Sequence, residues 1–185
     1  MKKNLISSAL AVLAFTLLFG IAYPLVVTGI AQVAFGKKAD GDPNLIAHDV
    51  KGSPRYFQPR PSATGWSPSA TFFANRGPNQ SSARFFYRDQ LAAYLKLEGP
   101  YNPGLTNAKV PADAVTMSGS GVDPLITEAN ARIQGRRVAA VRGIAPARVD
   151  ELIADSTDGR FLGVLGEPGV NVTKLNLALD AQGPR

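Results

Sequence analysis

The feature that most constrains this chain is a long run of uncharged residues close to its N-terminus. Residues 5–35 form 31 consecutive positions without a charged side chain, and most of them are apolar. Because about 20 apolar residues in a helix cross the hydrocarbon core of a bilayer, this run is long enough to span a membrane and continue beyond it. We therefore predict a transmembrane helix with its extension at residues 5–35, a short segment before it at residues 1–4, and a separate domain at residues 36–185.

The basic residues around the run bear on its processing and its orientation. A cleaved secretory signal has a basic start and an apolar run of about 7 to 15 residues. Lys2 and Lys3 supply that start, but the run here is too long, which favours an uncleaved anchor. The same two lysines favour a cytoplasmic N-terminus under the positive-inside rule, whereas Lys37 and Lys38 argue weakly for the opposite orientation.

Pro24 and several small residues are expected to shape the membrane helix. Proline lacks a backbone N–H, so Pro24 is expected to kink the helix or to end its regular part. Small residues allow a second helix to approach closely. The positions predicted to pack against partner helices are Gly20, Ala22, Pro24 and Gly29.

The composition excludes several classes of function for the domain. The chain has 20 basic and 14 acidic residues, so without Lys2 and Lys3 the remainder has 18 and 14, a mildly basic balance. No basic stripe typical of nucleic-acid binding is visible, so we expect membrane lipid rather than nucleic acid as a neighbour. Without cysteine, and with His48 as the single histidine, we expect no disulfide, no metal site and no catalytic set built on cysteine or histidine.

The domain is predicted to mix helices and strands, which places it in the α+β class. Residues 37–82 are rich in glycine, proline, serine and asparagine and are expected to form loops. Thr127 is expected to cap a helix that Gly143 closes, Pro146 to open another, and Ser82 to cap a third. The helices are predicted at residues 82–98, 128–142, 146–157 and 174–180, and the strands at residues 110–117, 161–165 and 170–172.

The glycine-rich segment at residues 118–121 is the best candidate for contact with a nucleotide. Its residues are Ser118, Gly119, Ser120 and Gly121. The sequence does not match a P-loop, which requires a G-x-x-x-x-G-K-[ST] pattern. A simple turn between a strand and a helix is the competing interpretation, and the two glycines between serines favour it.

Polar and aromatic residues in the loops at 56–79 are the predicted contact surface for partner proteins. Binding groups concentrate on loops that a rigid scaffold positions. The competing interpretation is that the aromatic side chains pin these loops to the core. The predicted partner contacts are Tyr56, Phe57, Arg60, Trp66 and Asn75.

Short segments spread in order over nearly the whole chain resemble one family. They include Ala-Tyr-Pro-Leu at 22–25, Pro-Arg-Tyr-Phe at 54–57, Arg-Pro-Ser-Ala at 60–63, Ser-Gly-Ser-Gly-Val-Asp-Pro at 118–124, Arg-Val-Ala at 137–139, Leu-Gly-Glu-Pro at 165–168 and Leu-Asn-Leu-Ala-Leu-Asp at 175–180. Together they resemble the C subunit of the bacterial Kdp potassium-transporting ATPase, KdpC. The chain departs from the family pattern at residues 47–48, Ala-His in place of Gly-Gln, and at residues 71–75.

The resemblance implies a non-catalytic accessory subunit of a high-affinity, ATP-driven potassium uptake complex. Its implied partners are a channel-like potassium-binding subunit, a P-type ATPase catalytic subunit and a small single-helix subunit. The implied location is the bacterial inner membrane, with a cytoplasmic N-terminus and a periplasmic domain. No cofactor is expected to bind tightly, because the complex handles ATP and the potassium ion. The implied roles are assembly and stability, a higher affinity of the ATPase subunit for ATP (a catalytic chaperone), and shaping of potassium entry.

Two other classes of function compete with this interpretation. A free-standing, membrane-anchored periplasmic binding or scaffold domain has the same sequence features and is the main alternative. A periplasmic hydrolase is the weaker one, because the chain has a single histidine and no cysteine and lacks a nucleophile motif such as G-x-S-x-G.

Overall fold

The computed structural model describes residues 2–36 and 41–182 of the chain. Lys37 and Lys38, which bear on the predicted orientation, lie outside the described residues. The chain divides into two compact units between Pro43 and Asn44. The first unit contains the apolar N-terminal helix, and the second contains the remaining helices and strands that the structure describes, except that one 3-10 turn begins at Pro43 and so crosses the boundary.

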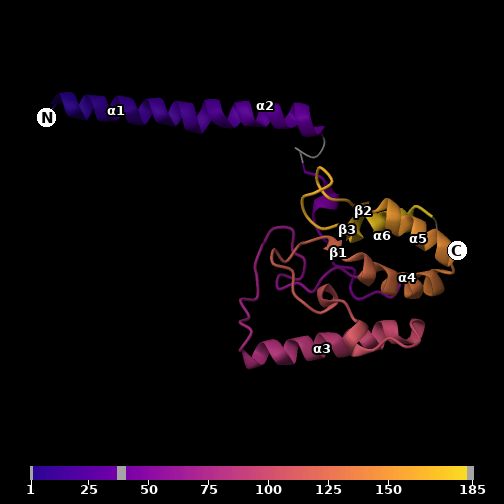
Figure 1. Cartoon of the computed structure of the whole chain (residues 1–185). Helices are drawn as coiled ribbons and strands as arrows, with labels where there is room; N and C mark the ends of the chain where they lie inside the picture. The colour runs from indigo at the N-terminus through magenta and orange to yellow at the C-terminus, as the bar shows by residue number, and fades with distance from the viewer. Residues whose placement is uncertain (1, 37–40, 183–185) are drawn as a thin grey trace. The chain divides into compact units, whose positions relative to one another are not determined.

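The N-terminal unit is a single long helix with one wide turn inside it (Figure 1). It consists of α1 (Lys2–Leu17), the π-helical turn η1 (Leu18–Ala22) and α2 (Tyr23–Phe35). In the wide turn the N–H of Tyr23 donates to the carbonyl of Leu18, so the regular α pattern is interrupted before Pro24 and resumes in α2, which contains it. An interruption beside Pro24 is what the missing backbone N–H of proline predicts. In the described part of this helix no residue is buried, and Lys2–Phe35 is apolar and long enough to cross a membrane. These features fit a single-pass membrane protein.

The second unit mixes helices and strands, which confirms the predicted α+β class. Its sheet has three short antiparallel strands in the order β1-β3-β2, so β3 lies in the centre. The strands are β1 (Leu125–Ile126), β2 (Thr157–Asp158) and β3 (Gly169–Asn171). The α-helices are α3 (Ser81–Glu98), α4 (Glu128–Arg142), α5 (Pro146–Asp155) and α6 (Val172–Asp180), and the 3-10 turns are η3 (Pro43–Leu45), η4 (Gly99–Tyr101), η5 (Asn107–Lys109) and η6 (Ala112–Ala114).

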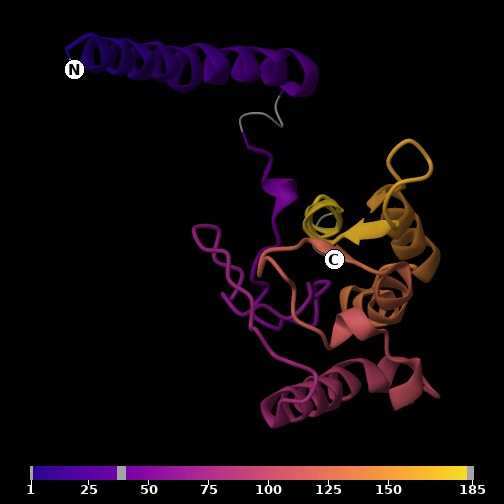
Figure 2. The same cartoon turned by 60° about the vertical axis from the view of Figure 1, so that its left-hand side comes forward.

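The core of this unit forms where α4, α5 and α6 meet the central strand. Helix α4 packs on α5 and also contacts α3 and β3. Both views show α3 at the end of the domain away from the sheet (Figures 1 and 2). The buried apolar side chains that fill the core are Phe57, Ile126, Ala131, Val138, Ala139, Val149, Leu152, Ile153, Val170, Val172, Leu175 and Leu179.

Several predicted helix ends are confirmed. The hydroxyl of Thr127 accepts the N–H of Asn130 at 3.2 Å and caps α4. Gly143 closes α4 with φ 67° and ψ 31°, a left-handed conformation that glycine adopts without strain. Pro146 is the first residue of α5. The expected cap at Ser82 is wrong: α3 begins at Ser81, and its N-cap Gln80 makes no side-chain cap bond.

Two of the predicted strands are wrong. Residues 110–117 contain the 3-10 turn η6, because Asp113 accepts hydrogen bonds from the N–H and the hydroxyl of Thr127 at 2.7 and 3.0 Å and holds the turn against α4. Residues 161–165 form a tight hairpin instead of a strand: Phe161 pairs with Leu165, and Leu162 and Gly163 between them have positive φ. The last strand and helix occur where they were predicted, within two residues at each end.

Candidate functional site

The four predicted helix-packing positions lie on two different sides of the N-terminal helix. Ala22 and Gly29 are seven residues apart, close to two turns, so they share one side. Gly20 and Pro24 are four residues apart and share another side, roughly opposite to the first. Within the described chain, a Cβ at Gly29 would meet nothing within 4 Å, and one at Gly20 would meet Thr16 Cγ2 at an ordinary 3.8 Å. The helix itself therefore does not require glycine at either position, and contact with a partner stays a prediction.

The predicted partner loop and the predicted nucleotide turn form one connected structure. Arg60 Nη2 donates to the carbonyl oxygen of Met117 at 3.1 Å and to the hydroxyl oxygen of Thr116 at 3.2 Å. The Arg60 Nη1 atom lies 3.5 Å from the carboxylate of Asp123. The indole N–H of Trp66 donates to the carbonyl of Arg60 at 3.0 Å. Arg60 thus links the loop to both sides of the turn at residues 118–121.

The serines of this turn bond to its own backbone. Ser118 is buried, and its hydroxyl accepts the N–H of Gly121 at 3.0 Å. The N–H of Ser118 donates to the carbonyl of Pro61 at 2.8 Å. The hydroxyl of Ser120 accepts the N–H of Val122 at 3.2 Å. The backbone N–H groups of Gly121 and Val122 therefore already donate to serine hydroxyls, so they are not available to bind a phosphate.

Gly121 is required by close packing and by its backbone conformation. Its φ is +79°, and a Cβ there would lie 2.8 Å from Thr64 Oγ1 and 3.1 Å from the carbonyl oxygen of Phe72. The carbonyl of Gly121 accepts the hydroxyl of Ser62 at 2.6 Å. Gly119 lies at the exposed tip of the turn. These contacts favour the structural-turn interpretation, and nucleotide contact stays a prediction.

Of the five predicted partner contacts, Phe57 has no place on an accessible surface. Its side chain is completely buried in the core, and its N–H and carbonyl bond to the amide of Asn176 at 2.9 and 3.0 Å. Tyr56, Arg60 and Trp66 are partly exposed, and Asn75 is exposed with φ +47°. For Phe57 the core-pinning interpretation of the loop aromatics is therefore the right one.

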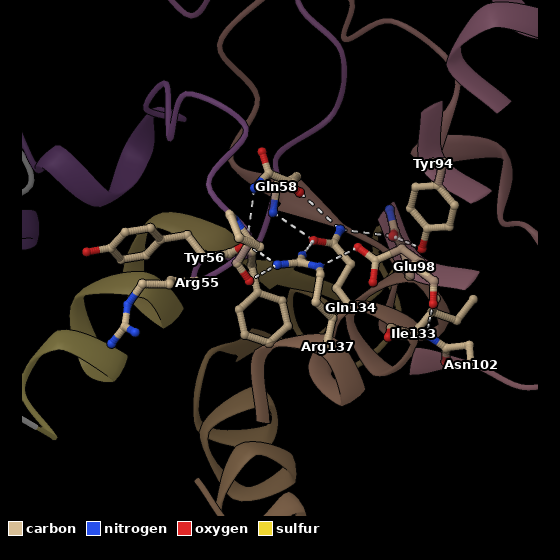
Figure 3. A network of polar contacts seen from close by, with 12 residues as sticks. Arg55, Tyr56, Gln58, Tyr94, Glu98, Asn102, Ile133, Gln134 and Arg137 are labelled. Carbon is tan, nitrogen blue, oxygen red and sulfur yellow. Dashed lines mark hydrogen bonds and ion pairs between the residues drawn. The ribbon is translucent and has the colours of Figure 1, made fainter. Parts of the chain in front are cut away.

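A buried ion pair that the sequence did not reveal lies behind this loop (Figure 3). Arg137 on α4 and Glu98 at the end of α3 are both fully buried, with 2.9 Å between Arg137 Nε and Glu98 Oε1. Arg137 Nη1 also donates to the carbonyl of Pro54 and, at 3.1 Å, to that of Tyr56. Since residues 54–58 form no helix or strand, their polar backbone groups need such partners when they are buried.

Two further polar side chains extend this network along α4. The backbone N–H of Gln58 donates to Gln134 Oε1 at 2.7 Å, and Gln134 Nε2 donates back to the carbonyl of Gln58 at 3.1 Å. Gln134 Nε2 also reaches Asn130 Oδ1 at 3.0 Å, which in turn accepts the hydroxyl of Tyr94 at 2.8 Å. Asn130, Gln134 and Arg137 recur at intervals of four and three on the buried side of α4. That spacing of polar residues within an apolar helix face was the signal available in the sequence.

Burial controls the ionisation of two members of the network. Burial raises the pKa of the Glu98 carboxyl above its usual value, while the Arg137 guanidinium pulls it back down. Burial also raises the pKa of Tyr94, and the nearby carboxylates of Glu98 and Asp113 raise it further, so its hydroxyl stays neutral and donates. Among residues 2–36 and 41–182, no group of three or more His, Asp or Glu side chains could hold a metal ion. The hydrogen bonds of the network hold the loop in place.

A surface hollow of about 350 Å³ lies beside the partner loop. Its polar lining includes His48, Lys51, Tyr56 and Asp180. The Tyr56 ring lies 4.7 Å from the guanidinium carbon of Arg142, and the Tyr56 hydroxyl donates to Asp180 at 3.2 Å. The altered dipeptide at residues 47–48 thus places the single histidine of the chain at this hollow.

Comparison with known proteins identifies the family. Residues 5–181 match the KdpC family, described as the c chain of a K⁺-transporting ATPase. The potassium-transporting ATPase KdpC subunit of Mycobacterium bovis (strain BCG / Pasteur 1173P2) is 41% identical over 191 residues, which cover 97% of this chain and 99% of that protein. The proteins of the same name from Koribacter versatilis and Rhodospirillum rubrum are 39% and 44% identical, covering 100% and 92% of this chain and 97% and 92% of their own lengths. The chain therefore belongs to the KdpC family of potassium-transporting ATPase subunits.

Proposed function

We propose that this chain is a non-catalytic accessory subunit of a high-affinity, ATP-driven potassium uptake complex and is needed for its assembly and stability. The observation that carries the proposal is the match to KdpC subunits over 92–100% of the chain at 39–44% identity. The architecture supports it, because one apolar helix joined to one domain provides a tether and a docking surface. The buried polar network on α4 serves to shape that surface.

In this proposal the N-terminus is cytoplasmic and the domain lies in the periplasm. Lys2 and Lys3 before the apolar helix support that orientation. The helix packs against helices of the channel-like subunit, the P-type ATPase subunit or the small single-helix subunit. The exposed parts of Tyr56, Arg60 and Trp66 contact the channel-like subunit near the point where potassium enters.

An effect on ATP affinity would act through the membrane helices. ATP is cytoplasmic, whereas the domain that carries residues 118–121 is proposed to be periplasmic. A subunit that changes affinity at a distant site must favour one conformational state of the complex over another. ATP and potassium therefore bind the partner subunits, and this chain biases the states in which they bind.

The test is affinity purification of the tagged full chain from native membranes in mild detergent during potassium starvation. We expect a P-type ATPase and a channel-like subunit to co-purify, with potassium-stimulated ATPase activity that is lost when this chain is deleted. Recovery of the chain alone would overturn the proposal and favour a free-standing anchored binding or scaffold domain.

A second measurement tests the anchor as the contact. Gly29→Leu and Gly20→Leu add bulk on two sides of the helix at positions where the helix itself has room, so each should lower recovery of partners if that side is packed. Thr28→Leu is the matched control, because it adds bulk one residue from Gly29 but about 100° around the helix. Equal recovery for all three variants would remove the anchor from the proposed interface.

A further inference from the structure

A short hairpin on the domain exposes four apolar side chains to solvent. It occupies residues 160–167, between β2 and β3, and we refer to it as the apolar hairpin. The Phe161 N–H donates to the carbonyl of Leu165 at 2.8 Å, and the Leu165 N–H donates back at 3.0 Å. The exposed fractions are 69% for Phe161, 78% for Leu162, 71% for Val164 and 58% for Leu165. A tip that is apolar at four of five successive positions indicates a contact surface rather than scattered surface residues.

The charges of the hairpin cancel at its base. Arg160 and Glu167 are its two charged residues, and they form an ion pair with 2.8 Å between Arg160 Nη2 and Glu167 Oε2. The tip therefore has no net charge with which to recognise an acidic or basic partner. The side chains at the tip are apolar, and one of them is aromatic, so the tip is suited to an apolar environment.

The hairpin starts close to the point where the chain joins the domain. The carbonyls of Asn44 and Ile46, the start of the domain, accept hydrogen bonds from Asn171 Nδ2 and Thr173 Oγ1, each at 2.7 Å. Asn171 ends β3, and Gly169 at the other end of β3 lies two residues after Glu167, where the hairpin ends. A strand rises about 3.3 Å per residue, so the four steps from Glu167 to Asn171 place the base of the hairpin within about 13 Å of the strand position that binds Asn44. In both views the hairpin lies toward the sheet end of the domain and α3 toward the opposite end (Figures 1 and 2).

Chain length then limits how far the domain can be from the bilayer. Phe35 ends the apolar helix and Asn44 begins the domain, so residues 36–43 connect them. Nine steps along an extended chain reach at most about 30 Å. The start of the domain is therefore held within about 30 Å of the end of the anchor helix, and the base of the hairpin within about 45 Å, a distance that leaves the bilayer within its reach.

We propose that the apolar hairpin inserts its four apolar side chains into the interfacial layer of the same bilayer, giving the domain a second membrane contact. The occupant is the lipid surface itself, because the tether brings that surface to the hairpin and the tip is apolar and neutral. Such a contact depends on buried apolar area and not on anionic lipid or ionic strength. The inference goes beyond the proposed subunit function and does not depend on it, since lipid alone is sufficient.

The test uses the full chain, which contains no cysteine, reconstituted in phosphatidylcholine nanodiscs. Leu162→Cys is labelled with an environment-sensitive fluorophore, and quenching by a shallow, lipid-borne nitroxide is measured. Ala92→Cys, at an exposed position of α3, is the matched control at the far end of the domain. We expect the label at residue 162 to be quenched several-fold more than the label at residue 92, with no change between about 50 mM and about 500 mM salt. Unchanged emission of Trp66 shows that each labelled domain keeps its fold.

Equal quenching at the two positions in lipid alone would overturn the proposal. So would quenching at residue 162 that disappears at high salt, because an electrostatic contact would then be responsible. Protection of residue 162 from a water-soluble quencher only when co-purified partner subunits are present would assign the hairpin to a protein partner instead. Val164→Cys, labelled in the same way, repeats the measurement at a second tip position in case the label disturbs residue 162.

Discussion

Replacing Arg137 should destabilise the domain more than replacing its ionic partner Glu98. Arg137→Met leaves the Glu98 carboxylate buried without a countercharge and removes the donor to the carbonyls of Pro54 and Tyr56. Breaking a buried ion pair from one side costs about 3–5 kcal/mol. Glu98→Gln also breaks the pair from one side, but it keeps an oxygen that can accept from Arg137 Nε and leaves the carbonyls of Pro54 and Tyr56 bonded, so its cost should lie at the lower end of that range, about 3 kcal/mol. The assay is urea unfolding of the full chain in mild detergent, followed by the emission of Trp66, the only tryptophan.

The double variant distinguishes the charge effect from the clamp on the loop. Arg137→Met combined with Glu98→Gln removes both charges, but the carbonyls of Pro54 and Tyr56 still lack their donor. Each unsatisfied buried acceptor costs about 1–3 kcal/mol, so the double variant should remain at least about 2 kcal/mol less stable than the native chain. A double variant that returns to native stability would refute the reasoning, because the loop clamp would then contribute nothing.

The same pair predicts a pH dependence with a definite sign. Burial raises the pKa of Glu98 in the folded domain, with Arg137 opposing that rise. The folded state therefore binds this proton more tightly than the unfolded state, and stability falls as pH rises from the ordinary carboxyl pKa of about 4.3 through the higher folded value. Arg137→Met should make the loss of stability with rising pH larger, and Glu98→Gln should remove the part of that loss that Glu98 causes. Unfolding free energies measured at about pH 4 and pH 8 check both, and a fall that persists unchanged in Glu98→Gln would assign the pH dependence to other groups.

Three single substitutions test other parts of the fold by the same unfolding assay. Gly121→Ala should lower the free energy of unfolding by about 2–4 kcal/mol, because it adds a close contact with Thr64 to the strain of a positive φ. Gly104→Ala is the control: Gly104 has a similar φ and nothing within 4 Å among the described residues, so the loss should be about 1–2 kcal/mol. Equal losses for the two variants would contradict the close-packing argument. Phe57→Ala should cost about 3–5 kcal/mol as a core truncation, whereas a change below about 1 kcal/mol would return Phe57 to the surface. Thr127→Ala should cost about 1–2 kcal/mol through loss of the α4 cap, and an unaltered midpoint would show that the cap contributes nothing.

Local signals in the sequence were sufficient to predict the anchor and most helix ends. The uncharged run, the Thr127 cap, the Gly143 stop and the Pro146 start each act within a few residues, so the sequence shows them directly. The two wrong strands depended on partners that are far away in the chain or absent. Asp113 folds residues 112–114 into a turn because Thr127 reaches it. The apolar residues 161–165 look like a buried strand, but in the described domain their apolar side chains stay largely exposed.

The polar network shows why the candidate site was only partly predictable. The sequence singles out loop residues such as Tyr56 and Arg60, whereas the side chains that fix the loop lie on α4, more than 70 residues later. The sequence shows one local signal of these long-range contacts. It is the presence of the polar residues Asn130, Gln134 and Arg137 within the buried face of α4. Phe57 depends on a second long-range contact, because its backbone N–H donates to Asn176 on α6, 119 residues later.

The wide turn η1 in the membrane helix sets the rotational phase between the two halves of that helix. A π-helical turn accommodates one residue more than a regular α-helix would hold in the same length. Deleting a single residue from Leu18–Ala22 would therefore let the helix close into one regular ladder. Because the wide turn completes its rotation with one extra residue, the two halves would keep nearly the same phase after this deletion. A residue deleted from within α1 or α2 would instead rotate the parts on either side of it by about 100°. Neighbouring helices that touch both halves would therefore keep both contact stripes after a deletion in the wide turn and lose one of them after a deletion elsewhere, so in this anchor the effect of losing one residue depends on where it is lost.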